Sequence, residues 1–397
     1  MGSGRSLVGL FAGIGGIELG FHRAGYFTEL LCEIDPAARA VLGTRFPDTP
    51  LELDVRRLRS LPKVELVAAG FPCQDLSQAG KTAGINGRQS GVVASVFRFL
   101  KHSASRPRWL LLENVPFMLQ LHRGRAMRFL VDELEALGFN WAYRVVDARA
   151  FGLPQRRKRV LLLASRSEDP RDILFQGSEH EPIPPDLDKV ACGFYWTEGF
   201  TGLGWAVDAV PTLKAGSTIG IPSPPAIRMP LDRSIVTPDI RDAERLQGFP
   251  SDWTQPALQV GVRKGARWRL VGNAVSVPLA EWLGQRLRCP VGRDARQDRP
   301  LAKGAPWPRA AWGMKGHAYR VDISMWPVQV TYQHLAEFLE YPTTSLSERA
   351  TAGFLRRIRA STTLHFPKGF KRDVANHLKE MRLETPSLLL PSSHDAD

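Results

Sequence analysis

The residue best suited to covalent chemistry is a cysteine, Cys73, on a predicted turn. An apolar run from Val64 to Ala69 predicts a buried strand, and Gly70-Phe71-Pro72 ends it just before Cys73. In an open α/β sheet, ligands bind and reactions take place beyond the carboxyl ends of the strands. Cys73 is therefore a candidate nucleophile. The alternative is a small buried apolar side chain, which is the common role of an isolated cysteine.

A carboxylate and a run of cations are predicted at the same edge of the sheet. Residues 108–112 predict a strand that ends in Glu113, so this carboxylate is placed to face Cys73. The run from Gln155 to Arg159 (QRRKR) precedes another predicted strand, residues 160–164. A basic run is often only a solvated surface. Here we predict contact with phosphate or substrate, because the chain as a whole is rich in positive charge.

A strand, a glycine turn and a helix begin the chain and predict a cradle for a nucleotide. Residues 6–11 predict the strand, Ala12-Gly13-Ile14-Gly15-Gly16 the turn, and residues 17–24 the helix. Glu33 follows the second predicted strand, 20 residues beyond Gly13, where an acidic residue reaches ribose hydroxyls in a βαβ unit. Glu18 replaces a glycine of the dinucleotide fingerprint, which argues against NAD. A tight connection and an acidic helix cap are the alternatives.

The order of these elements predicts an α/β protein of several domains. Alternating strands and helices over residues 1–165 predict a Rossmann-like catalytic and cofactor-binding core. Residues 166–243, rich in Gly, Pro and Trp, predict a small irregular domain, and residues 244–289 return to the core. Residues 290–310 read as a linker. Residues 311–397 predict a C-terminal α+β extension, with a strand at 318–323 and a role that the sequence does not assign.

The composition favours a cytoplasmic protein with a polyanionic partner. Fifty-three basic and 40 acidic residues give a net charge of +13, and such a surplus is typical of proteins that bind nucleic acid. The four cysteines form no Cys-x-x-Cys pair, which argues against a disulfide framework and against a metal site. No apolar stretch reaches the length of a membrane-spanning helix, and the short polar amino terminus is unlike a signal peptide.

Taken in order, these motifs resemble those of the DNA (cytosine-5) methyltransferases, of the bacterial and phage restriction-modification type. The resemblance covers residues 6 to 288. The matching stretches are Phe11–Gly16 (FAGIGG), Glu33, Asp54, Pro72-Cys73-Gln74, Glu113-Asn114-Val115, Gln155 with Arg157 and Arg159, Arg245–Pro250 (RLQGFP) and Gly272–Val275 (GNAV). The resemblance implies a Rossmann-like core that depends on S-adenosylmethionine, with target recognition in the small domain at 166–243.

The resemblance also implies a cofactor site. Phe11 would stack on the adenine, the backbone of Gly13–Gly16 would hold the methionine part, Glu33 would bind the ribose hydroxyls, and Asp54 would bind the adenine amino group. The Asn273 turn would close the pocket. The full set of implied cofactor residues is Phe11, Ala12, Gly13, Ile14, Gly15, Gly16, Glu33, Ile34, Asp54, Val55, Gly70, Pro72, Asn273 and Ala274.

The implied reaction methylates C5 of a cytosine that is flipped out of duplex DNA. The Cys73 thiolate would add to C6, Glu113 would hold or donate a proton at N3, and Arg157 and Arg159 would supply positive charge. The implied DNA contacts are Gln74, Ser77, Gln155, Arg156, Thr212 and Lys214, with Thr212-Leu213 resembling the Thr-Leu signature of the family's recognition domain.

Duplex DNA is the expected partner, and a cognate restriction or defence complex is a further candidate. We expect a monomer on DNA. Two other functions remain open at this point, an RNA cytosine-5 methyltransferase and a DNA-binding regulatory protein on the same fold. No Cys-Phe-Thr element of the RNA-modifying branch follows the recognition region. The chain departs from the residues usual in the family at Leu76 and at Val92-Val93. We expect these departures to affect the packing of the loop at 81–93.

Overall fold

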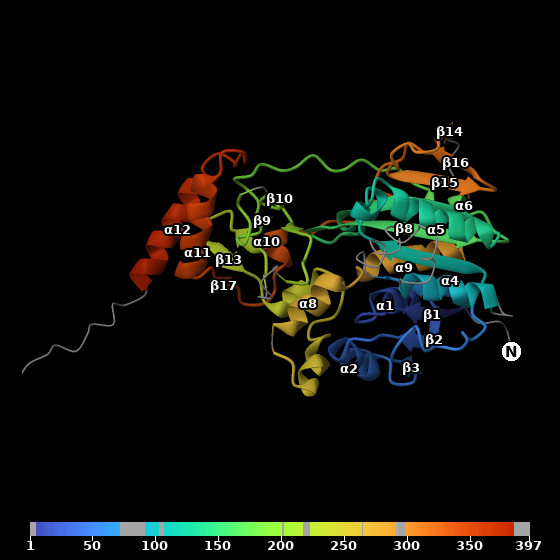
Figure 1. The fold of residues 1–397 in the computed structure, drawn as a ribbon. Helices are drawn as coiled ribbons and strands as arrows, with labels where there is room; N and C mark the ends of the chain where they lie inside the picture. The colour runs from blue at the N-terminus through green and yellow to red at the C-terminus, as the bar shows by residue number, and fades with distance from the viewer. Residues whose placement is uncertain are drawn as a thin grey trace, which may run out of the picture. The chain divides into compact units, whose positions relative to one another are not determined.

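The computed structural model describes residues 5–71, 92–102, 107–200, 202–216, 223–263, 265–290, 292 and 298–384 (Figure 1). The chain divides into two compact units. Unit 1 comprises Met1–Ile183, Thr212–Pro222 and Ile240–Gln333. Unit 2 comprises Pro184–Pro211, Ser223–Asp239 and His334–Asp397.

Unit 1 is built on a sheet with the order β14-β16-β15-β6-β8-β5-β4-β1-β2-β3. Its parallel part contains β1 (Ser6–Leu10), β2 (Phe27–Cys32), β3 (Leu51–Glu52), β4 (Leu66–Ala69) and β5 (Trp109–Asn114). β8 (Lys158–Ser165) runs antiparallel to β5 and to β6 (Asn140–Asp147). The central strands are almost entirely apolar because helices cover both faces. This arrangement confirms the predicted α/β, Rossmann-like core.

The helices of unit 1 cover the two faces of the sheet. α4 (Val92–His102) and α5 (Arg125–Ala136) pack with one set of strand side chains. α1 (Gly16–Arg23) and α9 (Val277–Arg288) pack with the other set. A Cβ on Gly20 would lie 2.6 Å from the Cβ of Ala280, so α9 approaches α1 closely. The helix that returns late in the chain thus completes the core begun by the first helix.

Shorter elements connect these layers. They are α2 (Pro36–Arg45), η1 (Pro116–Leu119), η2 (Ala148–Phe151), β7 (Gln155–Arg156), α6 (Arg171–Leu174), α7 (Ile240–Arg245), η3 (Gln255–Val260) and α8 (Ala266–Asn273).

The residues predicted as a linker and a separate extension are divided between the two units. β15 (Ala310–Met314) pairs antiparallel with β6, and β16 (His317–Arg320) and β14 (Arg299–Pro300) continue the main sheet. Their position in the sheet follows from burial, because Ala310 and Ala311 pack into the cores on its two faces. The strand predicted at 318–323 is thus observed as a hairpin that begins at Ala310.

Unit 2 combines two parts of the region predicted as a small domain, Pro184–Pro211 and Ser223–Asp239, with the end of the chain. Its sheet has the order β10-β9-β12-β13-β17, formed by β9 (Cys192–Phe194), β10 (Ala206–Val207), β12 (Ala226–Arg228), β13 (Ile235–Thr237) and β17 (Thr344–Ser345). β11 (Val210–Pro211), α10 (Leu335–Phe338), α11 (Glu348–Ala360) and α12 (Phe370–Glu384) complete it. Phe194 of β9 packs against Phe354 and Phe370, so the last two helices share one apolar core with the sheet.

Across the ranges that the structure describes, no helix is both long enough and apolar enough to cross a membrane.

Candidate functional site

The glycine turn follows β1 at the point where the strand order reverses. β1 lies between β2 and β4 in the parallel part of the sheet, and this reversal opens a crevice at the carboxyl ends of the strands. Phe11 and Gly13 both have a φ of 57°, and Gly15, the residue before α1, has a φ of 84°. A non-glycine residue such as Phe11 adopts this backbone conformation at a cost in energy, which is typical of binding sites.

Glu33 holds this turn from the end of β2. Its carboxylate accepts hydrogen bonds from the backbone N–H of Gly13 and of Asp35, each at 2.8 Å. Burial raises the pKa of Glu33, and the two N–H donors partly offset that shift. Asp35 caps α2 by accepting from the N–H groups of Ala37 and Ala38. Glu33, the predicted ribose acid, and Asp35, the cap of α2, therefore lie two positions apart and accept from different N–H groups.

Apolar side chains lie exposed beside this carboxylate. Ile34, directly after Glu33, is 63% exposed, and Leu53, directly after β3, is 51% exposed, while Phe11 is half-buried. All three follow the carboxyl ends of neighbouring parallel strands. A flat aromatic ligand would remove such surfaces from water, at roughly 25 cal/mol for each Å² covered. These surfaces therefore suit a flat apolar ligand at the carboxyl ends of the strands.

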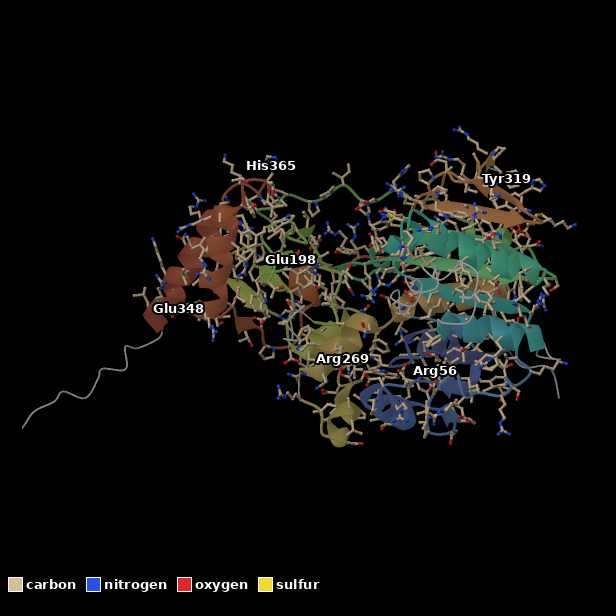
Figure 2. All side chains as sticks on the ribbon, viewed as in Figure 1. Arg56, Glu198, Arg269, Tyr319, Glu348 and His365 are labelled. Atoms are coloured by element: carbon tan, nitrogen blue, oxygen red, sulfur yellow. The ribbon has the colours of Figure 1, made fainter. Side chains whose placement is uncertain are left out.

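Asp54 is held in place by a neighbour. Its two oxygens accept from the Arg56 side chain at 2.9 Å and 2.7 Å, and this pairing lowers the pKa of Asp54 to about 2. Arg56 lies on the surface of unit 1 (Figure 2). An ionised carboxylate has about four lone-pair sites, so Asp54 can also accept from an amino group. Val55, predicted beside it, is buried.

The turn after α8 packs directly against the glycine turn. A Cβ on Gly16 would lie 2.3 Å from the carbonyl oxygen of Val275, so only glycine permits this approach. Trp253 adds a second support, because its indole N–H donates to the carbonyl of Ile14 at 2.8 Å. Asn273 is exposed and Ala274 is buried. The structure therefore brings the first and the last predicted cofactor motifs together.

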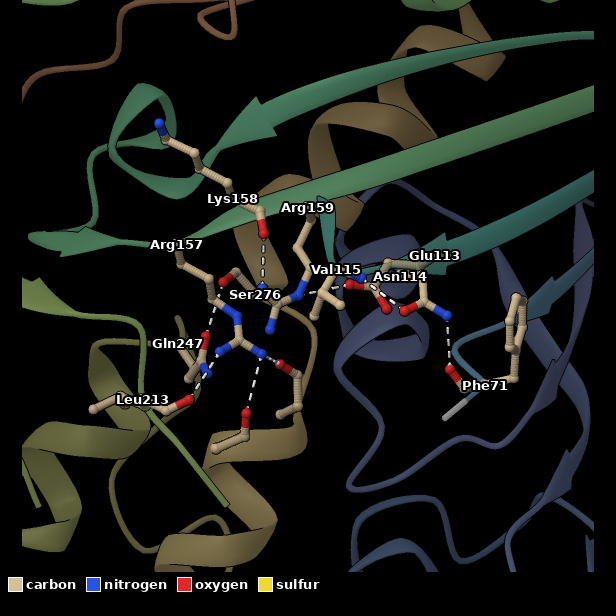
Figure 3. A network of polar contacts seen from close by, with 12 residues as sticks. Phe71, Glu113, Asn114, Val115, Arg157, Lys158, Arg159, Leu213, Gln247 and Ser276 are labelled. Atoms are coloured by element: carbon tan, nitrogen blue, oxygen red, sulfur yellow. Dashed lines mark hydrogen bonds and ion pairs between the residues drawn. The ribbon is translucent and has the colours of Figure 1, made fainter. Parts of the chain in front are cut away.

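A buried ion pair lies at the end of β5. Arg159 Nε is 2.9 Å from Glu113 Oε1, and both side chains are 9% exposed (Figure 3). Burial raises the pKa of the Glu113 carboxyl, and the charges of Arg159 and Arg157 offset part of that shift. A Cβ on Gly70, just beyond β4, would lie 3.5 Å from Glu113 Oε2. Glu113 therefore faces the segment that leads from β4 toward Cys73.

Asn114 fixes the last described residue of that segment. Its side-chain amide donates to the carbonyl of Phe71 at 3.0 Å, and its oxygen accepts from the N–H of Val115 at 2.8 Å. Phe71 is itself buried. Pro72, Cys73, Gln74 and Ser77, together with Leu76 and residues 81–91 of the predicted loop, lie outside the described residues. Val92 and Val93 belong to the first turn of α4.

Arg157 and Gln155 lie in the interior of unit 1 and connect segments that are distant in the sequence. The fully buried Arg157 guanidinium donates to the carbonyls of Leu213, Gly272 and Ala274 (Figure 3). The equally buried Gln155 donates to the carbonyl of Leu246 and accepts from the N–H of Leu213. Gln155, predicted as a DNA contact, is therefore buried, and its amide satisfies buried backbone groups.

The other described residues that were predicted to contact DNA lie beside the contacts of Gln155 and Arg157. The Thr212 hydroxyl donates to the carbonyl of Arg156 at 2.8 Å, so the predicted Thr-Leu signature is attached to β7. Arg156 and Thr212 are half-buried, and Lys214 is exposed. A Cβ on Gly272 would lie 2.3 Å from the carbonyl carbon and oxygen of Lys214. The signature and the Asn273 turn are therefore packed backbone to backbone.

Trp253 and Leu53 are site residues that the sequence reasoning did not name, and Asn114 was named only within a matching stretch, without a role. A buried amide after an apolar strand was the available signal for Asn114. The contact of Trp253 with Ile14 spans 239 positions of the chain, and no local pattern predicts it. In the parts of the chain that are described, His, Cys, Asp and Glu side chains form no group arranged to hold a metal ion.

Comparison with known proteins matches this chain to one family. The model of the family described as C-5 cytosine-specific DNA methylase matches residues 6–190. The chain is 50% identical over 376 residues to the Type II methyltransferase M2.BsuMI of Bacillus subtilis (strain 168), covering 92% of this chain and 96% of the relative. The Type II methyltransferase M.BsuFI of Bacillus subtilis is 29% identical over 301 residues, covering 69% of this chain and 70% of the relative.

A solved structure shares the fold. The S. pombe Dnmt2 methyltransferase superimposes with a TM-score of 0.53 and 17% identity, covering 71% of this chain and 98% of that one. The likeness to M2.BsuMI, by contrast, extends over nearly the whole of both chains. The chain therefore belongs to the C-5 cytosine-specific DNA methylase family and is a DNA (cytosine-5) methyltransferase.

Proposed function

We propose that this enzyme methylates C5 of a flipped cytosine in a specific duplex sequence, with Cys73 as the covalent nucleophile and S-adenosylmethionine as the methyl donor. The observation that supports this best is the buried Glu113–Arg159 pair, which faces the segment that leads to Cys73. Cytosine C5 is a poor nucleophile. Addition of a thiolate at C6 raises the electron density at C5, so that C5 can form the new carbon–carbon bond.

Glu113 is proposed to hold the proton that balances this addition. As the sulfur–C6 bond forms, negative charge develops on the ring, and a proton at N3 neutralises it. A carboxyl with a raised pKa retains its proton nearer to neutral pH than an ordinary glutamate does. Arg159 orients this carboxyl, and Arg157 adds positive charge from a greater distance. Loss of the C5 proton and of the thiolate then restores the aromatic ring.

The cofactor, when bound, supplies an electrophilic methyl group. Glu33 would accept from the ribose hydroxyls, Asp54 would accept from the adenine amino group, and Phe11 and Ile34 would cover the ring. The N–H groups of the glycine turn would hold the methionine part. Val55, Gly70, Pro72, Asn273 and Ala274 complete the proposed set of cofactor residues.

The proposed DNA contacts are Gln74, Ser77, Arg156, Thr212 and Lys214, with Gln155 positioning the Thr212–Lys214 segment from inside. Methylation of host DNA within a restriction-modification system is the proposed biological role, because the curated relatives are named Type II methyltransferases. We further propose that the enzyme acts in the cytoplasm, as a monomer on DNA, and that a cognate restriction complex is its partner in the cell.

The proposal is tested by methyl transfer from radiolabelled S-adenosylmethionine to duplex DNA and to tRNA. We expect transfer to duplex DNA alone, abolished by Cys73→Ser with binding of DNA retained. Bisulfite sequencing of DNA from cells that express the enzyme identifies the methylated cytosine and its sequence context. Transfer to tRNA alone, or ordinary turnover by Cys73→Ser, would overturn the proposal.

A further inference from the structure

A groove with several basic side chains lies in unit 1, between α5 and the hairpin region, which is defined here as residues 299–320 from β14 to β16. The groove has a volume of about 650 Å³, within the usual range of ligand sites. Arg123, Arg125 and Arg128 line it from α5 and the turn before it, and Lys303 and His317 line it from the hairpin region. No residue of this groove has a part in the proposed reaction.

The walls of the groove carry an unbalanced positive charge. Four Lys or Arg side chains line the groove, namely Arg123, Arg125, Arg128 and Lys303, of which only Lys303 comes from the hairpin side. The two acidic side chains in the groove, Asp132 and Glu135, come from further along α5. Glu135 is engaged internally, since it accepts from the Trp141 indole N–H and from the N–H of Gly316.

The basic end of the groove is rigidly built. The indole N–H of Trp307 donates to the carbonyl of Gly124 at 3.0 Å, which attaches the hairpin region to the start of α5. The Arg128 guanidinium lies 4.7 Å from the centre of the Trp307 ring, in a cation–π contact that fixes this long side chain. Tyr319, on the hairpin (Figure 2), lines the same groove. Arginines held in advance lose less entropy when they bind a phosphate.

The basic end also lies at the edge of the sheet where the reaction takes place. β5 ends at Asn114, and η1 and a short turn lead directly to Arg125, the first residue of α5. β5 and β6 are parallel, because both are antiparallel to β8, so α5 must run back from the carboxyl edge before β6 begins. Arg123 and Arg125 therefore lie near the edge at which Glu113 ends β5.

We propose that this groove binds the phosphodiester backbone of the DNA substrate beyond the base pairs around the target cytosine. A polyanion that already occupies the carboxyl edge can extend along it, and the four Lys and Arg side chains of the groove outnumber its two acidic ones. The inference rests on duplex DNA as the substrate, and it does not depend on the roles assigned to Cys73 and Glu113. It also gives a function to the hairpin region, which lies after the residues matched by the family model.

The test measures binding of two duplexes centred on the methylated sequence, one of 16 and one of 40 base pairs, by fluorescence anisotropy over a range of salt concentrations. The variant is Arg125→Gln with Lys303→Gln, since both side chains are exposed. The matched control is Arg59→Gln with Lys63→Gln, which removes equal charge from exposed positions before the amino end of β4. Thermal unfolding checks that both variants are folded.

We expect the groove variant to bind the 40-base-pair duplex several-fold more weakly, with the slope of log K against log salt smaller by about 1 to 2. Its binding to the 16-base-pair duplex and its methyl-transfer rate on that duplex should match those of the control. Unchanged affinity for the longer duplex, or an equal loss on both lengths, overturns the proposal. Unchanged DNA binding with weaker binding of a poly-glutamate peptide would indicate a protein partner, and would equally overturn it.

Discussion

Arg159 Nε and Glu113 Oε1 lie 2.9 Å apart at the end of β5, with 9% of each side chain exposed. The two residues come from antiparallel neighbours, β5 and β8, so the sheet itself sets their separation. Removal of one partner from a buried ion pair leaves an uncompensated charge, which typically costs about 3–5 kcal/mol. The pair is therefore a structural element of the sheet edge, and in the proposed reaction it keeps a carboxyl ready for proton transfer.

Glu113→Gln should slow methyl transfer by about 10²- to 10⁴-fold, the usual contribution of a positioned acid or base. Glutamine matches glutamate in shape but cannot release or take up the proton. Single-turnover rates on duplex DNA measure the effect, and binding of DNA and of cofactor serves as the control. A rate within a few-fold of the parent enzyme would remove Glu113 from the reaction.

Arg159→Gln should move the alkaline limb of the pH–rate profile to higher pH. The charge of Arg159 holds the pKa of Glu113 down against the effect of burial, so its removal raises that pKa further. The protonated carboxyl then persists to higher pH, although the rate at the optimum falls because the carboxyl is no longer oriented. The single-turnover rate measured from pH 6 to pH 9 provides the check. A limb that moves to lower pH would contradict the assignment of the proton to the Glu113 carboxyl.

Asn114→Ala should impair catalysis more than it impairs cofactor binding. The Asn114 amide holds the Phe71 carbonyl, two residues before Cys73, and loss of a buried hydrogen bond costs about 1–3 kcal/mol. We expect kcat to fall by at least tenfold while the Kd for S-adenosylmethionine stays within about twofold. Equal changes in both quantities would mean that Asn114 supports the fold as a whole rather than the approach to Cys73.

The stability of a Glu18→Gln variant, relative to that of the parent enzyme, should increase as the pH rises. Glu18 is completely buried in α1, and burial raises its pKa to about 8. Between the ordinary value of 4.5 and about 8, the unfolded chain loses this proton and the folded chain keeps it. The stability of the parent therefore falls over that window, by at most about 1.4 kcal/mol per pH unit, and the variant lacks this dependence. Urea unfolding of both proteins at pH 5 and pH 8 measures the free energy of unfolding. An equal change in this free energy between the two pH values for parent and variant would contradict the prediction.

Local patterns in the sequence predict those parts of the site that a single continuous stretch of residues forms. The apolar run before Glu113 and the glycines after β1 predict a strand end and a tight turn before a helix, and the structure has both. Gln155 shows where such reasoning ends. Its partners, Leu246 and Leu213, are 91 and 58 positions away, so only the folded chain reveals that its amide is buried.

The domain boundaries differ from the predicted ranges for a similar reason. Gly- and Pro-rich composition marks residues 290–310 as a linker, yet β14 lies within that range and belongs to the main sheet. Pairing of β15 with β6 joins residues more than 160 positions apart, as in Trp312 with Ala142. Packing of Phe354 against Phe194 likewise assigns the C-terminal helices to unit 2. Contacts of this range leave no periodic signal.

The most direct test of the account concerns the bond between sulfur and base. A duplex with 5-fluorocytosine at the methylated position cannot lose a proton from C5, so the adduct that precedes this step should persist. With S-adenosylmethionine present, mass spectrometry should find the DNA attached to the peptide that contains Cys73, and Cys73→Ala should give no adduct. An adduct at another residue, or an adduct that survives Cys73→Ala, would contradict the account.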